Sequence, residues 1–464
     1  MKNNVLNRRN FLKKTGVGIA ALALSSCERK PSKNTASSVQ IPNFIIILTD
    51  DQGYGDLGCY GGEGFSTPNL DTMASEGIKF SDFYVAATVC TPSRAGLLTG
   101  CYPKRVGLHE AVLFPYSTTG LHSSELTIPE LLKPQGYNSA CIGKWHLGHQ
   151  KKFLPLQHGF DEFFGVPYSN DMDNYYYKSL DFQSPPLPLY HNEEQIEAGP
   201  DQRFLTRRYT EQAQNFIKSN RNNPFFLYLP HSMPHLPLHV SDEFKGKSEL
   251  GLYGDVLEEL DWSVGQIQQT LKAQGLEDNT FVIFTSDNGP VVRPNAGSAG
   301  PLRGGKASTW EGGQRVPCIM KWPGQIPSGT ICKEIVTAMD LFPTIADISG
   351  ASLPKDRPID GQDILGLLQK PESTPSPHDS FHYYARDGNI EAVRSGKWKL
   401  HIAKTRGWDN NLGKFPKSLY NLEEDIGETK NLVDQHPEIV SRLHKKLKEF
   451  DVELNHQARP IGIV

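Results

Sequence analysis

Two apolar runs of the chain end in acidic residues. Residues 43–51, NFIIILTDD, are continuously apolar and rich in β-branched side chains before two aspartates, and residues 280–289, TFVIFTSDNG, repeat this pattern. An apolar run without alternation is typical of a central parallel strand that is buried on both faces. We therefore predict two buried strands whose carboxyl ends carry Asp50, Asp51, Asp287 and Asn288.

Helical patterns alternate with the strand-like runs. Residues 67–77 and 126–136 each close on glycine, and residues 224–230, PFFLYLP, form a further strand-like run. Residues 253–275 are amphipathic, with Leu257, Leu260, Val264, Ile267 and Leu271 on one side of a long helix. Strands that alternate with helices predict an α/β fold, a doubly wound and mostly parallel sheet flanked by helices.

The pattern changes near residues 370–380, where proline, glycine and serine accumulate. Beyond this point residues 379–404 alternate as antiparallel strands do, and residues 436–450 have the pattern of a closing helix. We predict a large domain over residues 41–375 and a small C-terminal α+β subdomain over residues 376–464.

The first 27 residues have the pattern of an export signal. Arg8 and Arg9 precede a short apolar run over residues 17–24, and LSSC follows, ending at Cys27. The pair of arginines resembles a twin-arginine signal, and LSSC resembles the cleavage box of a bacterial lipoprotein, in which Cys27 receives the lipid. The alternative is an ordinary signal with an incidental cysteine.

Residues 28–40 are polar and without periodicity, as in a flexible tether. We predict an exported bacterial protein of the periplasm or the outer surface, which engages the export machinery. Its contact with the membrane would be a lipid anchor on Cys27.

Composition narrows the function classes. The chain has 48 basic and 52 acidic residues and no basic stripe, so a nucleic acid is not an expected partner. Its seven cysteines are irregularly spaced and form no C-x-x-C pair, which favours neither a disulfide framework nor a zinc site.

The acidic residues after the two strands have the chemistry of a metal site. Loops at the carboxyl ends of parallel strands converge on the ligand site, and hard oxygen donors suit Ca²⁺ or Mg²⁺. Each acidic pair alone has another explanation, because Asp and Asn commonly cap helices and turns. Two pairs together favour a cation, since clustered carboxylates repel one another without one.

Basic residues in glycine-flanked segments complete the pattern. GKWHLG contains Lys144 and His146, HSMPHLP contains His231 and His235, and Lys306 lies among glycines. Each has an alternative as a surface lysine or a core histidine, which we favour for His231. Together with Arg94 the others predict an anion pocket beside a divalent cation, as a phosphate or sulfate ester hydrolase requires.

Residues 90–100, CTPSRAGLLTG, closely resemble the signature of the type I sulfatases, in which the cysteine of C-x-P-x-R is oxidised to formylglycine. The resemblance runs from LTDDQGYGDLG through GYNSACIGKWHLG, HGFDEFFGVPYSND, SDNG and GKASTWEGG to SLYNLEEDIGETKNL, which is nearly the whole chain after the signal. Within this branch of the alkaline phosphatase-like superfamily, the sequences of these motifs are most similar to those of arylsulfatase A and the N-acetylgalactosamine-6-sulfatases.

The resemblance implies a cofactor and a maturation partner. One Ca²⁺ would be bound by Asp50, Asp51, Asp287, Asn288 and the modified Cys90. The modification would come from a formylglycine-generating enzyme or an anaerobic sulfatase-maturating enzyme.

The resemblance also implies roles for the remaining residues. The aldehyde made from Cys90 hydrates to a geminal diol, and one hydroxyl, activated by the cation and Arg94, attacks sulfur. His235 and Lys306 match positions that assist the leaving alcohol, Lys144 fits an anchor for sulfate oxygens, and His146 takes the proton whose loss expels sulfate.

The predicted function is a sulfuric ester hydrolase that removes sulfate from a sulfated carbohydrate, such as a glycosaminoglycan or an algal-type polysaccharide fragment. One alternative is an arylsulfatase of broad specificity. Another is a phosphoester hydrolase of the alkaline phosphatase superfamily, although such enzymes mostly use a zinc pair with more histidine ligands. A non-catalytic glycan-binding protein should have lost some of the site residues.

Overall fold

The computed structural model describes residues 41–110, 112–173, 185–293, 296–403 and 415–464. The predicted signal and tether, including Cys27, lie outside the described residues. Residues 41–464 form one compact unit. The division into residues 41–375 and 376–464 stays a prediction.

A ten-stranded sheet forms the centre of this unit, in the order β12-β2-β11-β10-β1-β9-β5-β6-β7-β8. Its parallel middle consists of β10 (Thr280–Ser286), β1 (Asn43–Thr49), β9 (Phe225–Pro230), β5 (Asn138–Lys144) and β6 (Glu162–Val166). The two acid-terminated runs are therefore neighbouring strands. The mostly parallel α/β sheet predicted from the sequence is confirmed.

Shorter strands extend the sheet on both sides. On one side are β11 (Cys318–Lys321), β2 (Ile78–Phe80) and β12 (Thr330–Cys332), and on the other β7 (Pro188–His191) and β8 (Glu194–Ala198). Small pairs lie outside the sheet: β3 (Phe83–Tyr84) with β13 (Val336–Thr337), and β4 (Thr119–Gly120) with β18 (Gly462–Ile463).

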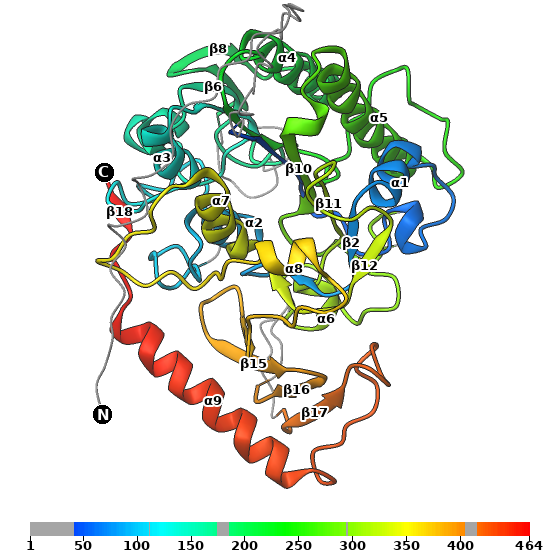
Figure 1. The fold of residues 1–464 in the computed structure, drawn as a ribbon, viewed down its shortest axis with the longest axis vertical. Helices are drawn as coiled ribbons and strands as arrows, with labels where there is room; N and C mark the ends of the chain where they lie inside the picture. Colours follow the sequence, from blue (N-terminus) through cyan, green and yellow to red (C-terminus); the bar gives the residue numbers. More distant parts are fainter. Residues whose placement is uncertain (1–40, 111, 174–184, 294–295, 404–414) are drawn as a thin grey trace, which may run out of the picture. The chain divides into compact units, whose positions relative to one another are not determined.

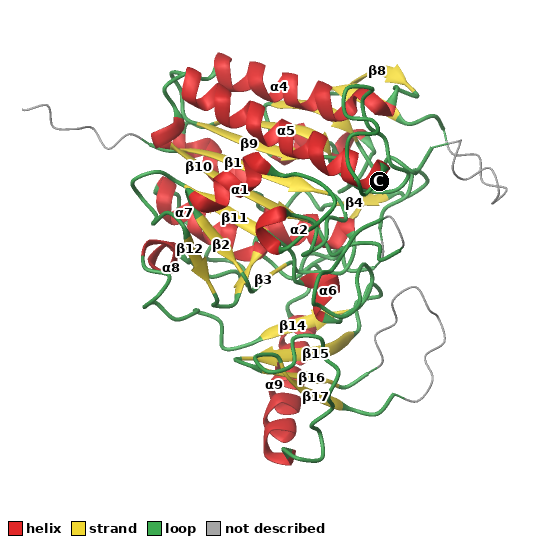
Figure 2. Ribbon diagram, turned by 90° about the vertical axis from the view of Figure 1, so that its right-hand side faces the viewer, coloured by secondary structure: helices red, strands yellow, loops and turns green. Residues whose placement is uncertain are grey.

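Alternate side chains of β1 enter two different cores. Phe44, Ile46 and Leu48 belong to one apolar cluster, and Ile45 and Ile47 belong to another. Helices cover both faces of the sheet, as Figure 2 shows. One face is covered by α1 (Pro68–Ser75), α4 (Leu205–Ser219) and α5 (Leu252–Ala273), and the other by α2 (Cys90–Thr99), α3 (Ile128–Leu132), α7 (Leu341–Ser349) and α8 (Leu365–Gln369).

A separate four-stranded antiparallel sheet follows near the C-terminus, with the final helix packed against it (Figure 1). It contains β14 (Phe381–Tyr384), β15 (Ile390–Ser395), β16 (Trp398–His401) and β17 (Ser418–Asn421), and the helix is α9 (Pro437–His456). Leu443 and Leu447 of α9 pack against Val393 and Leu400. This α+β arrangement is the one predicted from the alternating pattern.

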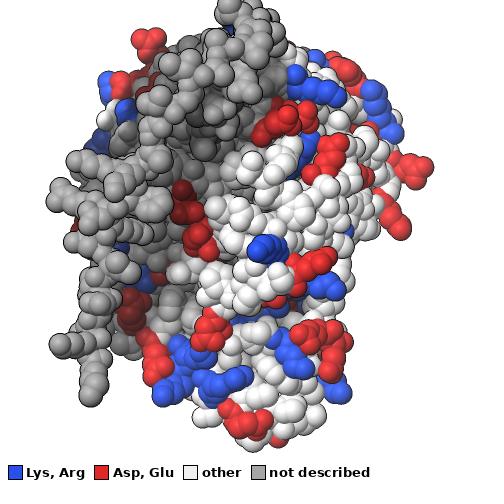
Figure 3. All heavy atoms as spheres, in the orientation of Figure 1, with Lys and Arg blue, Asp and Glu red and all other residues white. Residues whose placement is uncertain are grey.

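On the face drawn in Figure 3, basic side chains of the described residues are interspersed with acidic ones. Among the described residues, every cysteine is free, and no helix is long and apolar enough to cross a membrane.

Candidate active site

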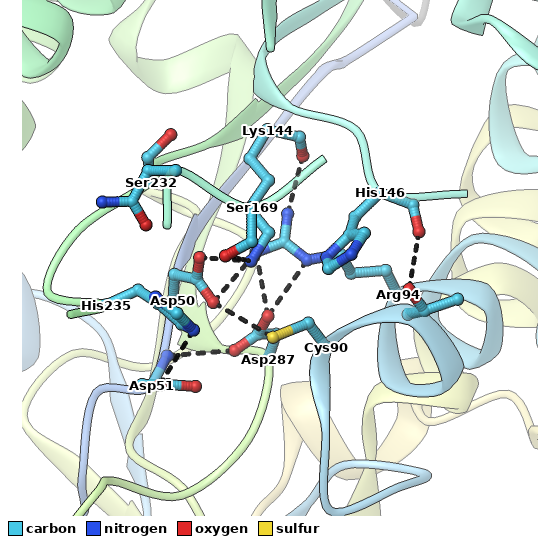
Figure 4. Close-up of polar contacts among 12 residues, drawn as sticks. Asp50, Asp51, Cys90, Arg94, Lys144, His146, Ser169, Ser232, His235 and Asp287 are labelled. Atoms are coloured by element: carbon cyan, nitrogen blue, oxygen red, sulfur yellow. Dashed lines mark hydrogen bonds and ion pairs between the residues drawn. The ribbon is translucent and has the colours of Figure 1, made fainter. Parts of the chain in front are cut away.

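Cys90 is the first residue of α2, and the C-x-x-x-R spacing follows from this helix. Residues four apart lie on the same side of an α-helix, so Cys90 and Arg94 face the same space. Figure 4 shows both side chains pointing from α2 toward Asp50 and Asp287. Cys90 Sγ lies 3.4 Å from Asp50 Oδ1. Pro92 falls in the first turn, where a helix needs no backbone N–H donor.

The acidic residues come together where β1 and β10 end. Asp51 has a φ of 66°, and its N–H donates to Asp287 Oδ1 at 3.1 Å. Asn288 Nδ2 donates to Asp51 Oδ1 at 2.7 Å. The other side-chain atom of this amide, Asn288 Oδ1, is buried and has no hydrogen-bond donor among the residues that the structure describes. It is therefore a free oxygen ligand inside the acidic cluster.

The loop after β10 packs closely on the short helix α6 (Glu311–Gln314), which follows the segment that carries Lys306. Gly289 N donates to Gly313 O at 3.0 Å. A Cβ at position 289 would lie 1.8 Å from Gly312 O, so only glycine fits at the end of the SDNG motif.

Each cationic side chain contacts one of the carboxylates. Lys144 Nζ lies 2.5 Å from Asp50 Oδ2, and Lys306 Nζ lies 2.7 Å from Asp51 Oδ2. Arg94 donates to Asp287 Oδ2 through Nε at 3.0 Å and Nη2 at 2.8 Å.

His235 lies beside the Lys306 contact. Its Nε2 is 3.6 Å from Asp51 Oδ2, and its Nδ1 is 2.6 Å from Leu236 O. A carbonyl oxygen only accepts, so Nδ1 carries the proton and Nε2 faces the carboxylate side of the site.

His146 is held in one tautomer by the backbone. Its Nε2 lies 3.0 Å from Leu113 O, which places the proton on Nε2. Nδ1 is buried and has no partner among the described residues. Burial, with Lys144 and Arg94 nearby, holds the pKa of His146 well below its usual value of 6.5. The ring is therefore neutral at neutral pH, with a lone pair available on Nδ1.

Burial sets the remaining protonation states. It would raise the pKa of Asp50, but Lys144, His235 and Arg94 hold that pKa well below its usual value. Burial and the Asp50 carboxylate raise the pKa of Asp287 to about 6, although Arg94 opposes the shift. Burial and Asp50 also raise the pKa of the Cys90 thiol well above its usual value.

The acidic cluster fits a hard divalent cation. Ligand atoms of Asp50, Asp51, Cys90 and His235 lie within 4.8 Å of one another. The unpartnered Asn288 Oδ1 adds a further oxygen ligand beside this group. Oxygen donors outnumber the single histidine, which suits Ca²⁺ better than zinc.

The charges of the site balance before any ion or substrate is added. The ion pairs join three carboxylates and three cationic side chains: Asp50 with Lys144, Asp51 with Lys306, and Asp287 with Arg94. A divalent cation would give this group a net positive charge, and that excess would attract an oxyanion.

All ten residues predicted from the sequence lie in this one site. His231, interpreted as a core histidine, is buried, and its Nε2 is 3.3 Å from Ser263 Oγ.

The sequence analysis missed two supporting residues. Ser169 Oγ accepts from Lys144 Nζ at 3.1 Å, and Thr91 Oγ1 donates to His146 O at 2.9 Å. The position of Thr91 inside the signature was the only signal available for it.

A buried group of cations and oxygen ligands at the carboxyl end of a parallel sheet defines a hydrolase of esters that carry an oxyanion. Comparison identifies which ester. The family model described as Sulfatase matches residues 42–351, and one described as N-sulphoglucosamine sulphohydrolase, C-terminal, matches residues 305–453. The chain belongs to the sulfatase family and is a sulfuric ester hydrolase.

Relatives match over most of their length. N-acetylgalactosamine-6-sulfatase of Mus musculus is 41% identical over 433 residues, covering 88% of this chain and 81% of the relative. Arylsulfatase A of Bos taurus is 38% identical over 447 residues, covering 89% and 87%. A crystal structure of Ps i-CgsB with k-i-k-neocarrahexaose is 31% identical, with a TM-score of 0.79, covering 91% of this chain and 95% of the other.

Proposed function

We propose that this sulfatase removes sulfate from a sulfated carbohydrate and that Cys90, converted to formylglycine, provides its nucleophile. The position of Cys90 carries the proposal. The residue is only 1% exposed, and its Sγ lies 3.4 Å from Asp50 Oδ1. Arg94, Lys144 and Lys306 lie in the same site. Formylglycine would supply a hydrated aldehyde, whose two hydroxyl groups stand where the thiol is.

The chain's own residues divide the work around that position. Arg94, fixed by Asp287 and by Lys144 O at 2.7 Å, keeps its guanidinium on the nucleophile's side of the helix. Lys144 is placed to hold sulfate oxygens. His146 offers the unpartnered Nδ1 lone pair as the acceptor of a proton.

Lys306 and His235 both approach Asp51 Oδ2, at 2.7 and 3.6 Å. They form the side of the pocket where a leaving oxygen would gain charge. A Ca²⁺ held by Asp50, Asp51, Asp287 and Asn288 would act as a Lewis acid on a sulfate oxygen.

Three observations support a carbohydrate substrate. Relatives are named N-acetylgalactosamine-6-sulfatase, and the similar structure of Ps i-CgsB holds an oligosaccharide. In this chain, a cavity of about 440 Å³ lies next to the His235 loop, a size that suits a small ligand. Most of the residues that line it have polar or charged side chains: Asp173, Asp201, Gln202, Arg203 and His239, together with Pro200 and Pro237.

Asn170 connects this cavity to the site. It follows Ser169, the partner of Lys144, and its Nδ2 donates to Pro237 O and Gln202 Oε1, both at 3.1 Å. Carboxylates, a guanidinium and an imidazole edge match the hydroxyl groups of a sugar ring, which both donate and accept.

The experiment measures free sulfate released by aldehyde-containing enzyme from sulfated mono- and oligosaccharides, nitrophenyl sulfate and nitrophenyl phosphate. The aldehyde is verified by mass spectrometry of the peptide that contains Cys90, and Cys90→Ala is the control. We expect release from a sulfated sugar, and none with Cys90→Ala.

Activity on nitrophenyl sulfate alone would favour an arylsulfatase of broad specificity. Faster turnover of the phosphate would favour a phosphoester hydrolase. Full activity of Cys90→Ala would reject the proposed nucleophile.

A further inference from the structure

The loop that carries Lys306 is held on both sides by the C-terminal sheet. It runs over residues 303–311, between β10 and the short helix α6 (Glu311–Gln314). Lys399 of β16 and Glu428, which follows β17, are both fully buried and contact this loop. We call these two residues the Lys399–Glu428 pair.

The pair contacts the backbone of the loop on the C-terminal side of Lys306. Lys399 Nζ donates to Thr309 O at 2.9 Å, and Glu311 N donates to Glu428 Oε2 at 2.8 Å. Lys399 Nζ also lies 2.9 Å from both Glu311 Oε1 and Glu428 Oε1. One ammonium group therefore joins the loop, α6 and the C-terminal sheet.

The N-terminal side of the loop is held through Arg303. Its Nη1 donates to Glu428 O at 2.7 Å, and its guanidinium lies 3.7 Å from the centroid of the Trp310 ring. Glu428 has a φ of 51°, a conformation that non-glycine residues seldom adopt. Its side chain and its carbonyl thereby reach opposite ends of the same loop.

Between these anchors the loop turns Lys306 into the site. Lys306 N donates to Pro290 O at 2.7 Å, and Ala307 N donates to Thr88 O at 2.9 Å. Ala307 has a φ of 67°, so this turn is unfavourable in isolation and depends on the contacts around it.

We propose that Lys399 and Glu428 are positioning residues for Lys306, and that through them the C-terminal sheet sets the enzyme's ability to expel poor leaving groups. The inference rests on the proposed role of Lys306 at the leaving oxygen. Neither residue touches Asp50, Asp51 or Cys90 in any described contact, so their effect passes through the loop.

The leaving group distinguishes positioning from simple stabilisation. An ammonium group at the leaving oxygen matters most when that oxygen gains a large negative charge, as an alcohol does, and less for a nitrophenol. A displaced Lys306 should therefore slow alkyl sulfates more than nitrophenyl sulfate. A general loss of folded enzyme would lower both rates equally.

The test measures kcat and KM of aldehyde-containing enzyme on a series of aryl and alkyl sulfates of increasing leaving-group pKa. We expect Lys399→Met to lower kcat for the poorest leaving group by about 10- to 100-fold, the scale of a misplaced catalytic group. We expect a smaller loss with nitrophenyl sulfate and partial recovery with Lys399→Arg.

A double-mutant cycle adds a second readout. Lys306→Ala should show the same dependence on the leaving group, and Lys399→Met should cost little more once Lys306 is absent. Lys321→Met is the matched control, because Lys321 is also a buried lysine between two glutamates, Glu76 and Glu277, at 2.6 and 2.9 Å. It should lower the melting temperature and leave the dependence on the leaving group unchanged.

Arg303→Ala keeps the test decisive if Lys399→Met does not fold, because Arg303 is exposed. We expect a smaller change of the same kind. Equal losses across the series, or additive losses in the cycle, would overturn the inference. If the wild-type enzyme turns over nitrophenyl sulfate, the proposed nucleophile works, and a negative result then counts against the positioning role alone. Because the series contains no sugar, the test does not depend on the proposed carbohydrate substrate.

Discussion

At the scale of single residues, the site contains backbone conformations that are unfavourable in isolation. Asp51 and His146 both have positive φ values, of 66° and 62°. Such backbone conformations persist only where the surrounding structure requires them, and they cluster at functional sites. Here the carboxylate of Asp51 reaches Lys306, and the ring of His146 reaches Leu113 O.

Substitution of His146 tests its proposed role as the acceptor of a proton. Replacing it by alanine removes the lone pair on Nδ1, and we expect kcat to fall about 10²- to 10⁴-fold, the usual contribution of a positioned acid or base. Steady-state turnover of nitrophenyl sulfate measures the effect. His158→Gln is the control, because His158 is also buried but packs against Trp145. Equal activity of His146→Ala and wild type would exclude the role.

Substitution of Asn288 tests the proposed metal site through thermal stability and not through activity. Because its Oδ1 is buried without a donor, Asn288→Ala should remove a ligand and raise the calcium concentration needed for thermal stabilisation. Wild type should gain about 2.7 kcal/mol at a hundredfold excess of calcium over its dissociation constant. Calorimetry after chelation, with calcium returned stepwise, measures this gain.

Asn220→Ala provides the comparison for Asn288→Ala. Asn220 is also buried, but it bonds to Asn138 and Phe216. Its calcium dependence should match wild type. If Asn288→Ala also matched wild type, the ligand assignment would be wrong.

Individual site residues were predictable because the polar ones follow buried strands or lie in a long signature. Asp50 and Asp287 end apolar runs, and Cys90 and Arg94 share one motif. The partner of His146 was not predictable, because it is the backbone carbonyl of Leu113 and a carbonyl has no residue-type signature.

At the scale of elements, the helix α2, which carries the proposed nucleophile, could not be predicted from a periodic sequence pattern. All ten residues of α2 are buried, so no polar face marks its period, and Pro92 and Gly96 lower its helix propensity. The strands β11, β2 and β12, which extend the sheet beyond β10, are three or four residues long and had no recognisable pattern in the sequence either. The long amphipathic α5 and the two apolar strands were clear.

The start of α7 contains a pH-dependent ion pair. His378 Nε2 lies 2.8 Å from both carboxylate oxygens of Asp340, the N-cap residue of α7. Burial alone would lower the pKa of His378, but Asp340 raises it above its usual value of 6.5. The pair's contribution to stability is therefore complete below about pH 6.5 and is lost as the pH rises through the raised pKa.

We expect His378→Gln to lower the free energy of unfolding by about 1.5 to 3 kcal/mol below pH 6.5, the range for a hydrogen bond to a charged group, and by less at pH 9. Denaturant unfolding across this range measures the difference.

His382→Gln is the control with the opposite sign. Burial lowers the pKa of His382 to about 3, so this residue contributes to the loss of stability as the pH falls below 6.5, and the variant should lose less stability than wild type there. A penalty for His378→Gln that does not vary with pH would contradict the ion pair.

At the scale of the whole molecule, the C-terminal sheet packs against the loop that carries Lys306. Trp310 of the Lys306 loop contacts Tyr420 and Leu422, and Lys399 reaches the same loop from β16. These contacts join residues about 90 to 120 positions apart, for which no local pattern exists. The α+β character of this region was predictable from the alternation of apolar and polar residues. Its contacts with the Lys306 loop were not predictable.

The N-terminal prediction concerns the place of the whole enzyme in the cell. Residues 1–40 lie outside the described residues, so the proposal rests on Arg8, Arg9 and the LSSC sequence that ends at Cys27. Lipid on Cys27 would keep the enzyme at a membrane, because two or more acyl chains anchor a protein stably where a single chain does not. An anchored sulfatase would act on polymers outside the cytoplasm.

We expect Cys27→Ala to move the enzyme from the membrane fraction to the soluble fraction while nitrophenyl sulfate turnover per folded molecule stays the same. Cell fractionation and the mass of the N-terminal peptide measure both parts of the expectation. Cys59→Ala is the control, since Cys59 is a half-buried free cysteine of the folded unit. Membrane association of Cys27→Ala equal to wild type would reject the lipid anchor and favour an ordinary signal, because removal of the only acylated residue leaves no other attachment in the proposal.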